Sequence, residues 1–276
     1  MKFAICNETF LDWPLEKAIE VAKDAGYTGL EIAPFTLAAD AYQISQMQRV
    51  HVRQTIEDAG MEVVGLHWLL AKTTGFYLTT PDAAVRKKTS NYLCELARCC
   101  RDLGGTLMVL GSPQQRNLLP NVTHEQGMLY AAEVLKGAVP TFEKCNVTLA
   151  IEPLGPVEGD FLNTAASGLQ LMEMVNSVFC RLHLDCKAMS TEARPVADII
   201  RDFAPHMAHF HANDPNKLGP GMGELDFVPI MKALLDVNYQ DWVSVEVFDY
   251  TPGPEVLARD SLNNLYAALE QAKTLA

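Results

Sequence analysis

Eight short apolar runs recur along the chain, each followed by a longer stretch with apolar positions at helical spacing. The runs are rich in Val, Ile, Leu and Phe and are almost uninterrupted, which is typical of parallel strands buried on both faces. They lie at 2–7, 28–34, 61–68, 106–111, 147–153, 179–185, 207–213 and 242–248. The pattern therefore predicts eight parallel strands.

The stretches between the runs carry signals of helix ends. Pro14 opens one stretch, where proline suits the first helical turn, and Gly104 and Gly105 follow another at the position of a C-cap. The predicted helices are one that opens at Pro14 and those at about 42–59, 82–103, 125–144, 164–177, 195–204, 226–237 and 254–274. Strand and helix thus alternate from end to end.

Eight strand–helix units with no linker or break in composition favour an α/β fold, a single (β/α)₈ TIM barrel spanning 1–276. The alternative is an open doubly wound sheet, which normally carries a glycine-rich phosphate-binding turn after an early strand. Gly104 and Gly105 precede their strand, and the glycines at 219–223 lack a following long helix at the right offset. The barrel is therefore the predicted fold.

Composition and charge restrict the classes of partner that we expect. No apolar stretch reaches the roughly 18 residues of a membrane span, and the net charge of −12 opposes binding to phosphate backbones and anionic membranes. We therefore expect neither nucleic acid nor membrane as a partner. Seven cysteines without a CxxC pair, and a start without signal-peptide features, favour reduced thiols and a cytoplasmic location.

Ionisable residues stand at or near the ends of the fifth to eighth runs, one on each run. These residues are Glu152, Asp185, His211 and Glu246. In a (β/α)₈ barrel the carboxyl ends of the strands meet at one rim, where active sites lie. Salt bridges or helix caps would explain a single such residue, but four in succession favour a shared metal ion. Three carboxylates and one imidazole suit one divalent ion, Mn²⁺ first and Mg²⁺, Co²⁺ or Zn²⁺ as alternatives.

Strand alternation supports this arrangement, because residues two apart share a face. The four residues should point into the barrel together with the side chains two positions before them. That inward set adds Ala150, His183, His209 and Ser244, and leaves an apolar outward set of Leu149, Ile151, Leu182, Leu184, Phe210, Val245 and Val247. We expect His183 and His209 to hydrogen-bond to the metal carboxylates rather than to bind the ion.

With these residues in place, the sequence resembles the sugar phosphate isomerase/epimerase family of xylose-isomerase-like barrels. The chemistry most similar to it is that of the D-tagatose and D-psicose 3-epimerases. The resemblance covers essentially the whole chain and is clearest over 147–248, while 111–116 (GSPQQR) and 219–227 (GPGMGELDF) also look like this group. It implies that the four residues bind one metal ion, usually Mn²⁺. It also implies that Glu152 and Glu246 exchange the substrate proton and that Glu158 hydrogen-bonds to the substrate.

Two positions depart from the epimerases. Ala188 stands where they carry a histidine, and Lys217 stands where they carry an arginine, and both family residues hold substrate oxygens. We therefore expect a different substrate. Lys217 and Arg116 are candidates for binding an anionic group, with solvated loop cations as the alternative. His67 is a candidate for lining the pocket, with packing in the core as the alternative.

The predicted function is that of a metal-dependent isomerase or epimerase. Its substrate is a sugar or a sugar-derived keto or hydroxy compound that reacts through an enediolate, with Glu152 and Glu246 transferring the proton. One alternative is a dehydratase or lyase acting on a keto-sugar or keto-inositol, and another is a non-catalytic sugar-binding barrel. An apurinic-site endonuclease fits less well, because the acidic charge opposes DNA binding. The family resemblance also suggests a homodimer or homotetramer.

Overall fold

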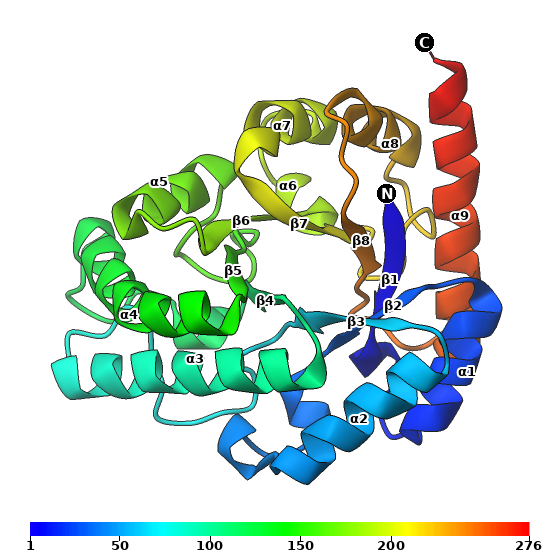
Figure 1. The fold of residues 1–276 in the computed structure, drawn as a ribbon. Helices are drawn as coiled ribbons and strands as arrows, with labels where there is room; N and C mark the ends of the chain where they lie inside the picture. Colours follow the sequence, from blue (N-terminus) through cyan, green and yellow to red (C-terminus); the bar gives the residue numbers. More distant parts are fainter. Residues whose placement is uncertain (276) are drawn as a thin grey trace.

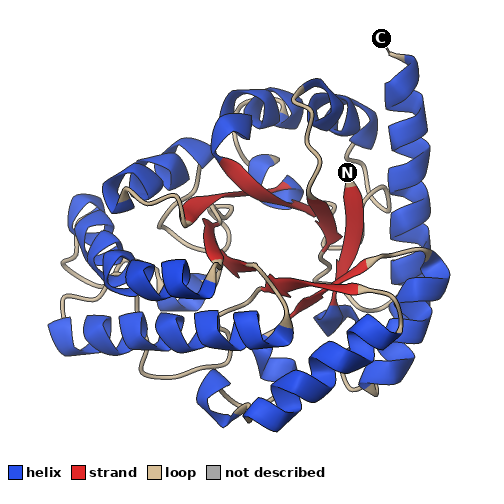
Figure 2. Cartoon of the chain, viewed as in Figure 1, coloured by secondary structure: helices blue, strands red, loops and turns tan. Residues whose placement is uncertain are grey.

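All eight predicted runs form strands of one closed parallel barrel within residues 1–275, the part of the chain that this computed structural model describes (Figures 1 and 2). The strands are β1 (Lys2–Cys6), β2 (Gly29–Ile32), β3 (Glu62–Leu66), β4 (Leu107–Leu110), β5 (Thr148–Ile151), β6 (Cys180–Asp185), β7 (Met207–Ala212) and β8 (Trp242–Val245). They pair in sequence order, and β8 closes on β1 with Trp242 opposite Lys2. The predicted (β/α)₈ barrel is confirmed, and the open doubly wound sheet is excluded.

The helices of more than one turn surround the barrel as an outer layer, and the single-turn helix directly follows β6 (Figure 2). The helices are α1 (Leu15–Ala25), α2 (Gln46–Asp58), α3 (Ala83–Leu103), α4 (His124–Cys145), α5 (Ala165–Val175), α6 (Cys186–Met189), α7 (Val196–Phe203), α8 (Phe227–Asp236) and α9 (Pro254–Thr274). Local signals set their ends: the Asp82 carboxylate accepts from the first backbone N–H groups of α3, and Gly104 ends that helix with φ of 93°. Across residues 1–275, none of these helices has the length and hydropathy to cross a bilayer.

The single turn α6 is the main element that the sequence pattern missed. β6 ends at Asp185, and the chain turns at once into α6, whose Ala188 N–H donates to the Asp185 carboxylate. Strand alternation therefore does not reach Lys187, whose orientation is set by the turn α6.

Two apolar clusters confirm the predicted alternation along the strands. The small inner cluster fills the barrel below the polar layer and consists of Ala4, Val64, Leu107, Val109 and Ala150. The large outer cluster lies between the strands and the helices, and it contains every residue of the predicted outward set. Because the outward positions carry the packing, the inward positions near the carboxyl ends are left for polar side chains.

Candidate metal centre and substrate cavity

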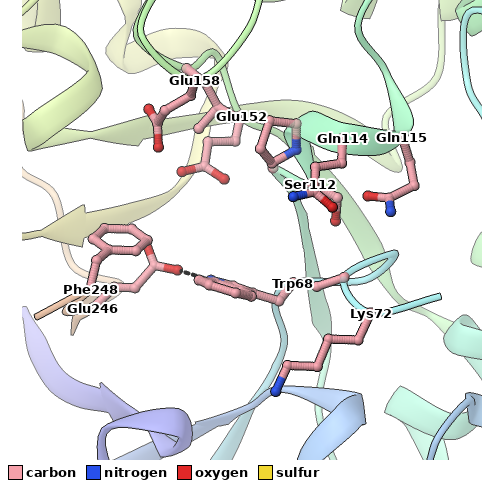
Figure 3. Close-up of a pocket in the computed structure, with 13 residues that line it drawn as sticks. Trp68, Lys72, Ser112, Gln114, Gln115, Glu152, Glu158, Glu246 and Phe248 are labelled. Carbon is pink, nitrogen blue, oxygen red and sulfur yellow. Dashed lines mark hydrogen bonds between the residues drawn. The ribbon is translucent and has the colours of Figure 1, made fainter. Parts of the chain in front are cut away.

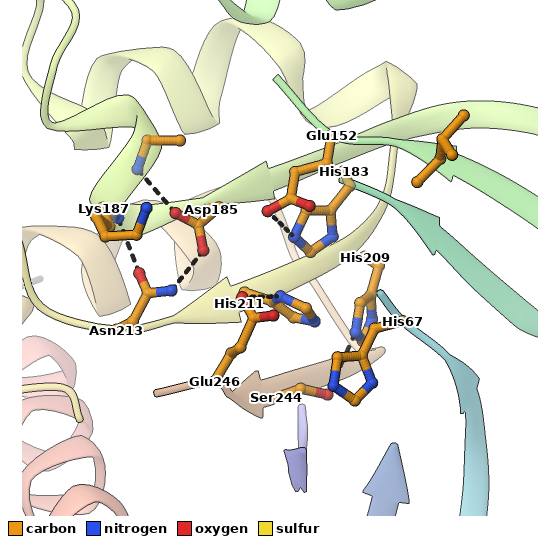
Figure 4. A network of polar contacts seen from close by, with 12 residues as sticks. His67, Glu152, His183, Asp185, Lys187, His209, His211, Asn213, Ser244 and Glu246 are labelled. Atoms are coloured by element: carbon orange, nitrogen blue, oxygen red, sulfur yellow. Dashed lines mark hydrogen bonds and ion pairs between the residues drawn. The ribbon is translucent and has the colours of Figure 1, made fainter. Parts of the chain in front are cut away.

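The four predicted metal ligands meet at the carboxyl end of the barrel (Figure 4). Glu152 and Glu246 directly follow β5 and β8, Asp185 ends β6, and His211 lies in β7; all four are buried. Ligand atoms of Glu152, Asp185 and His211 lie within 4.8 Å of one another. Glu246 joins them, because its Oε2 lies 3.0 Å from His211 Nδ1.

This cluster fits a divalent cation on electrostatic grounds. Burial, followed by the charges of Glu246 and Asp185, raises the pKa of Glu152 well above its usual range. Burial also raises the pKa of Asp185, although Lys187 opposes the shift. Carboxylates that are held together away from water destabilise one another, and a bound divalent ion would remove that repulsion.

His183 belongs to the same cluster. It is fully buried, its Nε2 lies 3.9 Å from Glu152 Oε1, and neither ring nitrogen has a hydrogen-bond partner among the described residues. One of its nitrogens also lies within 4.8 Å of ligand atoms of Glu152, Asp185 and His211. Sequence reasoning assigned His183 to hydrogen bonding, whereas the structure places it at ligand distance. An unpartnered imidazole at this place is a further sign that the site suits a cation.

Asn213 orients the Asp185 carboxylate and was missed by the sequence analysis. Its Nδ2 donates to Asp185 Oδ2 at 2.5 Å, and the backbone N–H of Ala188 donates to Oδ1 at 2.7 Å. Asn213 lies two residues beyond His211, so the alternation that selected His211 would have found it. The two bonds fix the carboxylate at the rim of the barrel.

A layer of carboxylate–histidine pairs lies beneath the candidate metal centre. Glu31 in β2 contacts Nε2 of His209 at 2.8 Å and Nε2 of His211 at 3.1 Å. Burial would raise the pKa of Glu31, but the two imidazoles lower it well below its usual range. Glu8 contacts His67 Nε2 at 2.5 Å, and both residues are buried. Neither acid was predicted; the available signal was a carboxylate inside or directly after an apolar run.

A cavity of about 370 Å³ opens above this centre (Figure 3). Its volume falls in the range of roughly 300–1,000 Å³ that is usual for small-molecule sites. The lining joins aromatic rings, polar side chains and three carboxylates: Trp68, Phe248, Leu154, Ala71, Pro113, Gly111, Lys72, Ser112, Gln114, Gln115, Glu152, Glu158 and Glu246. The predicted acid–base pair thus reaches the cavity from β5 and β8, which are not neighbours in the barrel.

Trp68 and Gly111 hold the two glutamates in place. Trp68 Nε1 donates to Glu246 Oε1 at 2.6 Å, and the indole stacks on Phe248 with 6.1 Å between ring centroids. Its backbone has φ of 51°, in the left-handed region that non-glycine residues seldom occupy. A Cβ atom at Gly111 would collide with the Glu152 carboxylate, so this approach requires glycine.

Glu158 is the one predicted substrate-binding residue that lines the cavity. Its Oε2 accepts from the backbone N–H of Gly155 at 3.2 Å, and its Oε1 lies 2.7 Å from Lys187 Nζ. The Lys187 amine also lies 4.7 Å from the centroid of the Phe248 ring. The ammonium group of Lys187 therefore lies between Glu158 and Phe248, two side chains of the cavity wall. Lys187 belongs to the turn α6, which the sequence pattern missed.

The other three candidates for substrate binding are not part of the cavity lining. Lys217 is exposed, and its backbone carbonyl accepts from the N–H of Phe248 at 2.8 Å. Arg116 is buried rather than solvated, and its NH1 donates to the backbone carbonyl of Glu152 at 2.6 Å. His67 is buried in its pair with Glu8, which matches the alternative of core packing.

Comparison with known proteins shows the family of this chain. The model of the xylose isomerase-like TIM barrel family matches residues 19–268. The chain belongs to this family. A probable ketose 3-epimerase of Synechocystis is 26% identical over 275 residues, covering 91% of this chain and 89% of the relative. An L-ribulose 3-epimerase of Mesorhizobium japonicum is 32% identical over 193 residues, covering 69% and 65%.

One solved structure shares the fold over nearly the whole length of the chain. The D-psicose 3-epimerase of Clostridium cellulolyticum superposes with a TM-score of 0.86 at 20% identity, covering 98% of this chain and 99% of that one. At that level of identity the likeness shows the fold alone.

Proposed function

We propose that this protein is a divalent-metal-dependent sugar epimerase or isomerase. The observation that carries the proposal is the convergence of Glu152 and Glu246 on one cavity, with Asp185 and His211 beside them. A relative that matches over 91% of the chain is named a probable ketose 3-epimerase, which supports the same chemistry. We assign the metal to Glu152, Asp185, His211 and Glu246, with Mn²⁺ as the first choice because oxygen donors predominate.

The chain's own residues supply the proton transfer. Glu152 and Glu246 face the cavity from separate strands, as Figure 3 shows, so that a sugar bound between them presents opposite sides to the two carboxyl groups. One carboxylate removes the proton from the carbon beside the carbonyl group, and the other returns a proton to a carbon of the same enediolate. A bound divalent ion would supply Lewis-acid stabilisation of the negative charge on the substrate oxygens. The place of proton return decides between epimerisation and isomerisation.

The cavity wall favours a ketose-like substrate. Trp68 and Phe248 offer aromatic surface for the apolar face of a sugar, while Glu158 and Gln114 offer hydrogen-bonding groups for its hydroxyls. The Lys187–Glu158 pair brings a cation to this wall, on the turn that also carries Ala188. We therefore propose a ketose whose hydroxyl pattern differs from that of D-tagatose and D-psicose.

Proton exchange in D₂O tests the proposal. The Mn²⁺-loaded protein is incubated with ketoses, keto-sugar acids and their phosphates, and NMR follows deuterium at carbon. We expect exchange on at least one substrate. It should disappear with a chelator and in Glu152→Gln and Glu246→Gln, whereas Glu143→Gln on the exposed side of α4 should keep it.

Three outcomes separate the alternatives. Loss of water from a keto-sugar or keto-inositol after exchange would favour the dehydratase or lyase. Ligand binding that Glu246→Gln leaves unchanged, without exchange on any substrate, would favour a sugar-binding barrel. Exchange that persists in both glutamine variants would contradict the assignment of the acid–base pair.

A further inference from the structure

Glu31 is an acid buried inside the barrel and has no part in the proposed proton transfer. It lies in β2 with an exposed fraction of 0%, and it does not line the cavity. A carboxylate in such a place is costly unless close polar groups satisfy it. Its neighbours therefore indicate what it does.

The neighbours within hydrogen-bond distance are two histidines of β7, a strand that is not adjacent to β2 in the barrel. Glu31 Oε2 lies 2.8 Å from His209 Nε2, and Glu31 Oε1 lies 3.1 Å from His211 Nε2. An ionised carboxylate can only accept hydrogen bonds, so each Nε2 must carry a hydrogen. Glu31 thus determines which nitrogen of each ring donates.

The other nitrogen of His211 faces the candidate metal centre. His211 Nδ1 lies 3.0 Å from Oε2 of Glu246, and an atom of the same ring belongs to the cluster with Glu152 and Asp185. Once Nε2–H is committed to Glu31, Nδ1 is the nitrogen whose lone pair is available to a cation. The ring is held at both edges, by Glu31 below and by the rim carboxylate above.

We infer that Glu31 is a positioning residue of the metal centre. By accepting Nε2–H of His211, it turns Nδ1 toward the ion and increases the basicity of that nitrogen. The second bond, from His209, fixes the Glu31 carboxylate so that it does not rotate away. This inference rests on the proposed metal site, but it does not depend on the identity of the substrate.

A structural role alone would have a different signature. A buried ion pair that only stabilises the fold changes the free energy of unfolding, and it leaves the affinity of a correctly folded protein for metal unchanged. The matched case in this chain is Glu95 in α3, which lies 2.7 Å from the buried Arg49 of α2, outside the barrel. Glu95→Gln therefore controls for the loss of a buried charge pair.

The experiment compares Mn²⁺ dissociation constants of the wild-type protein, Glu31→Gln and Glu95→Gln. Free Mn²⁺ is measured by EPR during titration, and urea unfolding of the metal-free proteins is measured in parallel. We expect Glu31→Gln to raise the dissociation constant by about 10- to 100-fold, as loss of such an outer partner commonly does. Glu95→Gln should bind Mn²⁺ as the wild type does, even where its unfolding midpoint falls.

A second measurement needs no variant to fold. In ¹⁵N spectra of the wild-type protein loaded with diamagnetic Zn²⁺, His211 should carry a hydrogen on Nε2 and none on Nδ1. An Nε2 of His211 without a hydrogen would overturn the inference, as would a Mn²⁺ dissociation constant for Glu31→Gln equal to that of the wild type. Failure of the wild type to bind any ion would overturn both the inference and the proposed function, whereas the first two results would leave the proposed function standing.

Discussion

At the scale of single residues, the candidate site could be predicted where chemistry coincides with strand alternation. Glu152, Asp185, His211 and Glu246 stand at or near the ends of apolar runs, and the structure brings all four together. Glu31 was not predicted, because it lies within an early apolar run and not at the end of a later one. Contacts between residues far apart in sequence, such as Glu31 with His209, leave no local pattern.

The indole N–H of Trp68 yields the first prediction. Trp68→Phe keeps an aromatic ring on the cavity wall but removes the bond to Glu246 Oε1. A hydrogen bond to a charged group contributes about 1.5–3 kcal/mol, so misplacement of the carboxylate should lower kcat by roughly tenfold or more. KM should change less, because the aromatic surface remains. Steady-state kinetics on the substrate found by proton exchange measure both.

The control for that variant is Trp242→Phe. Trp242 begins β8 at the opposite end of the barrel, where Lys2 lies 4.0 Å from its ring centroid. It should retain wild-type kcat. Equal kcat in Trp68→Phe and the wild type would show that the indole N–H has no part in placing Glu246.

The ion pair between Lys187 and Glu158 yields the second prediction. Lys187→Met keeps an unbranched side chain, one atom shorter, but leaves Glu158 Oε1 without the amine at 2.7 Å. We expect KM to rise by about tenfold, equivalent to roughly 1.4 kcal/mol, with a smaller change in kcat, because Glu158 lies on the wall and not among the proton-transferring groups. Lys232→Met removes a comparable lysine–aspartate pair from the surface of α8 and should leave both constants unchanged. The opposite pattern, a fall in kcat at constant KM, would contradict a binding role.

At the scale of elements, the strands were predictable because burial on both faces produces short and almost uninterrupted apolar runs. Seven of the eight runs exceed their strands at the carboxyl end, as 242–248 does for β8 (Trp242–Val245). The extra residues leave the sheet to carry Glu246 and Phe248 to the cavity. The turn α6 has only four residues, too few for helical spacing to appear, so Lys187 could not be assigned to the site from sequence.

The outward face of β6 yields a prediction at this scale. Leu182 is fully buried in the outer cluster, and a Cβ built at Gly168 of α5 would lie 2.7 Å from its Cδ1. Leu182→Ala should therefore destabilise the fold by about 2–5 kcal/mol through lost burial and the remaining cavity. Val178→Ala, at a side chain that is 78% exposed, should change the unfolding free energy little. Urea unfolding monitored by circular dichroism measures both, and equal stability of the two variants would contradict the packing described.

At the scale of the whole molecule, the (β/α)₈ barrel divides stability from chemistry. The outer cluster packs strands against helices, while the barrel interior holds an apolar lower part and a polar upper part. The apolar runs directly predicted the packing of strands against helices. The separation of the interior into an apolar lower part and a polar upper part depends on which inward side chains share one level of the barrel. That is set by the register between strands, such as Asp185 opposite His211.

Metal binding should therefore stabilise the whole fold. Glu152, Asp185 and Glu246 are buried beside one another, and a cation that binds only the folded state offsets their repulsion. At a free Mn²⁺ concentration of 100 times the dissociation constant, the stabilisation is about 2.7 kcal/mol. For a chain of this size that corresponds to a rise in Tm of roughly 5–10 °C. Calorimetry over a series of Mn²⁺ concentrations measures it.

Asp185→Asn separates this effect from unspecific binding of cations to an acidic surface. The variant loses one proposed ligand and one buried charge, and its amide nitrogen cannot accept the bond from Asn213 Nδ2. The effect of Mn²⁺ is therefore measured against the variant's own metal-free Tm. Its Tm should respond to Mn²⁺ far less. A metal-induced shift of equal size in both proteins would place the ion elsewhere on a surface with a net charge of −12. The four residues would then need another explanation for their convergence.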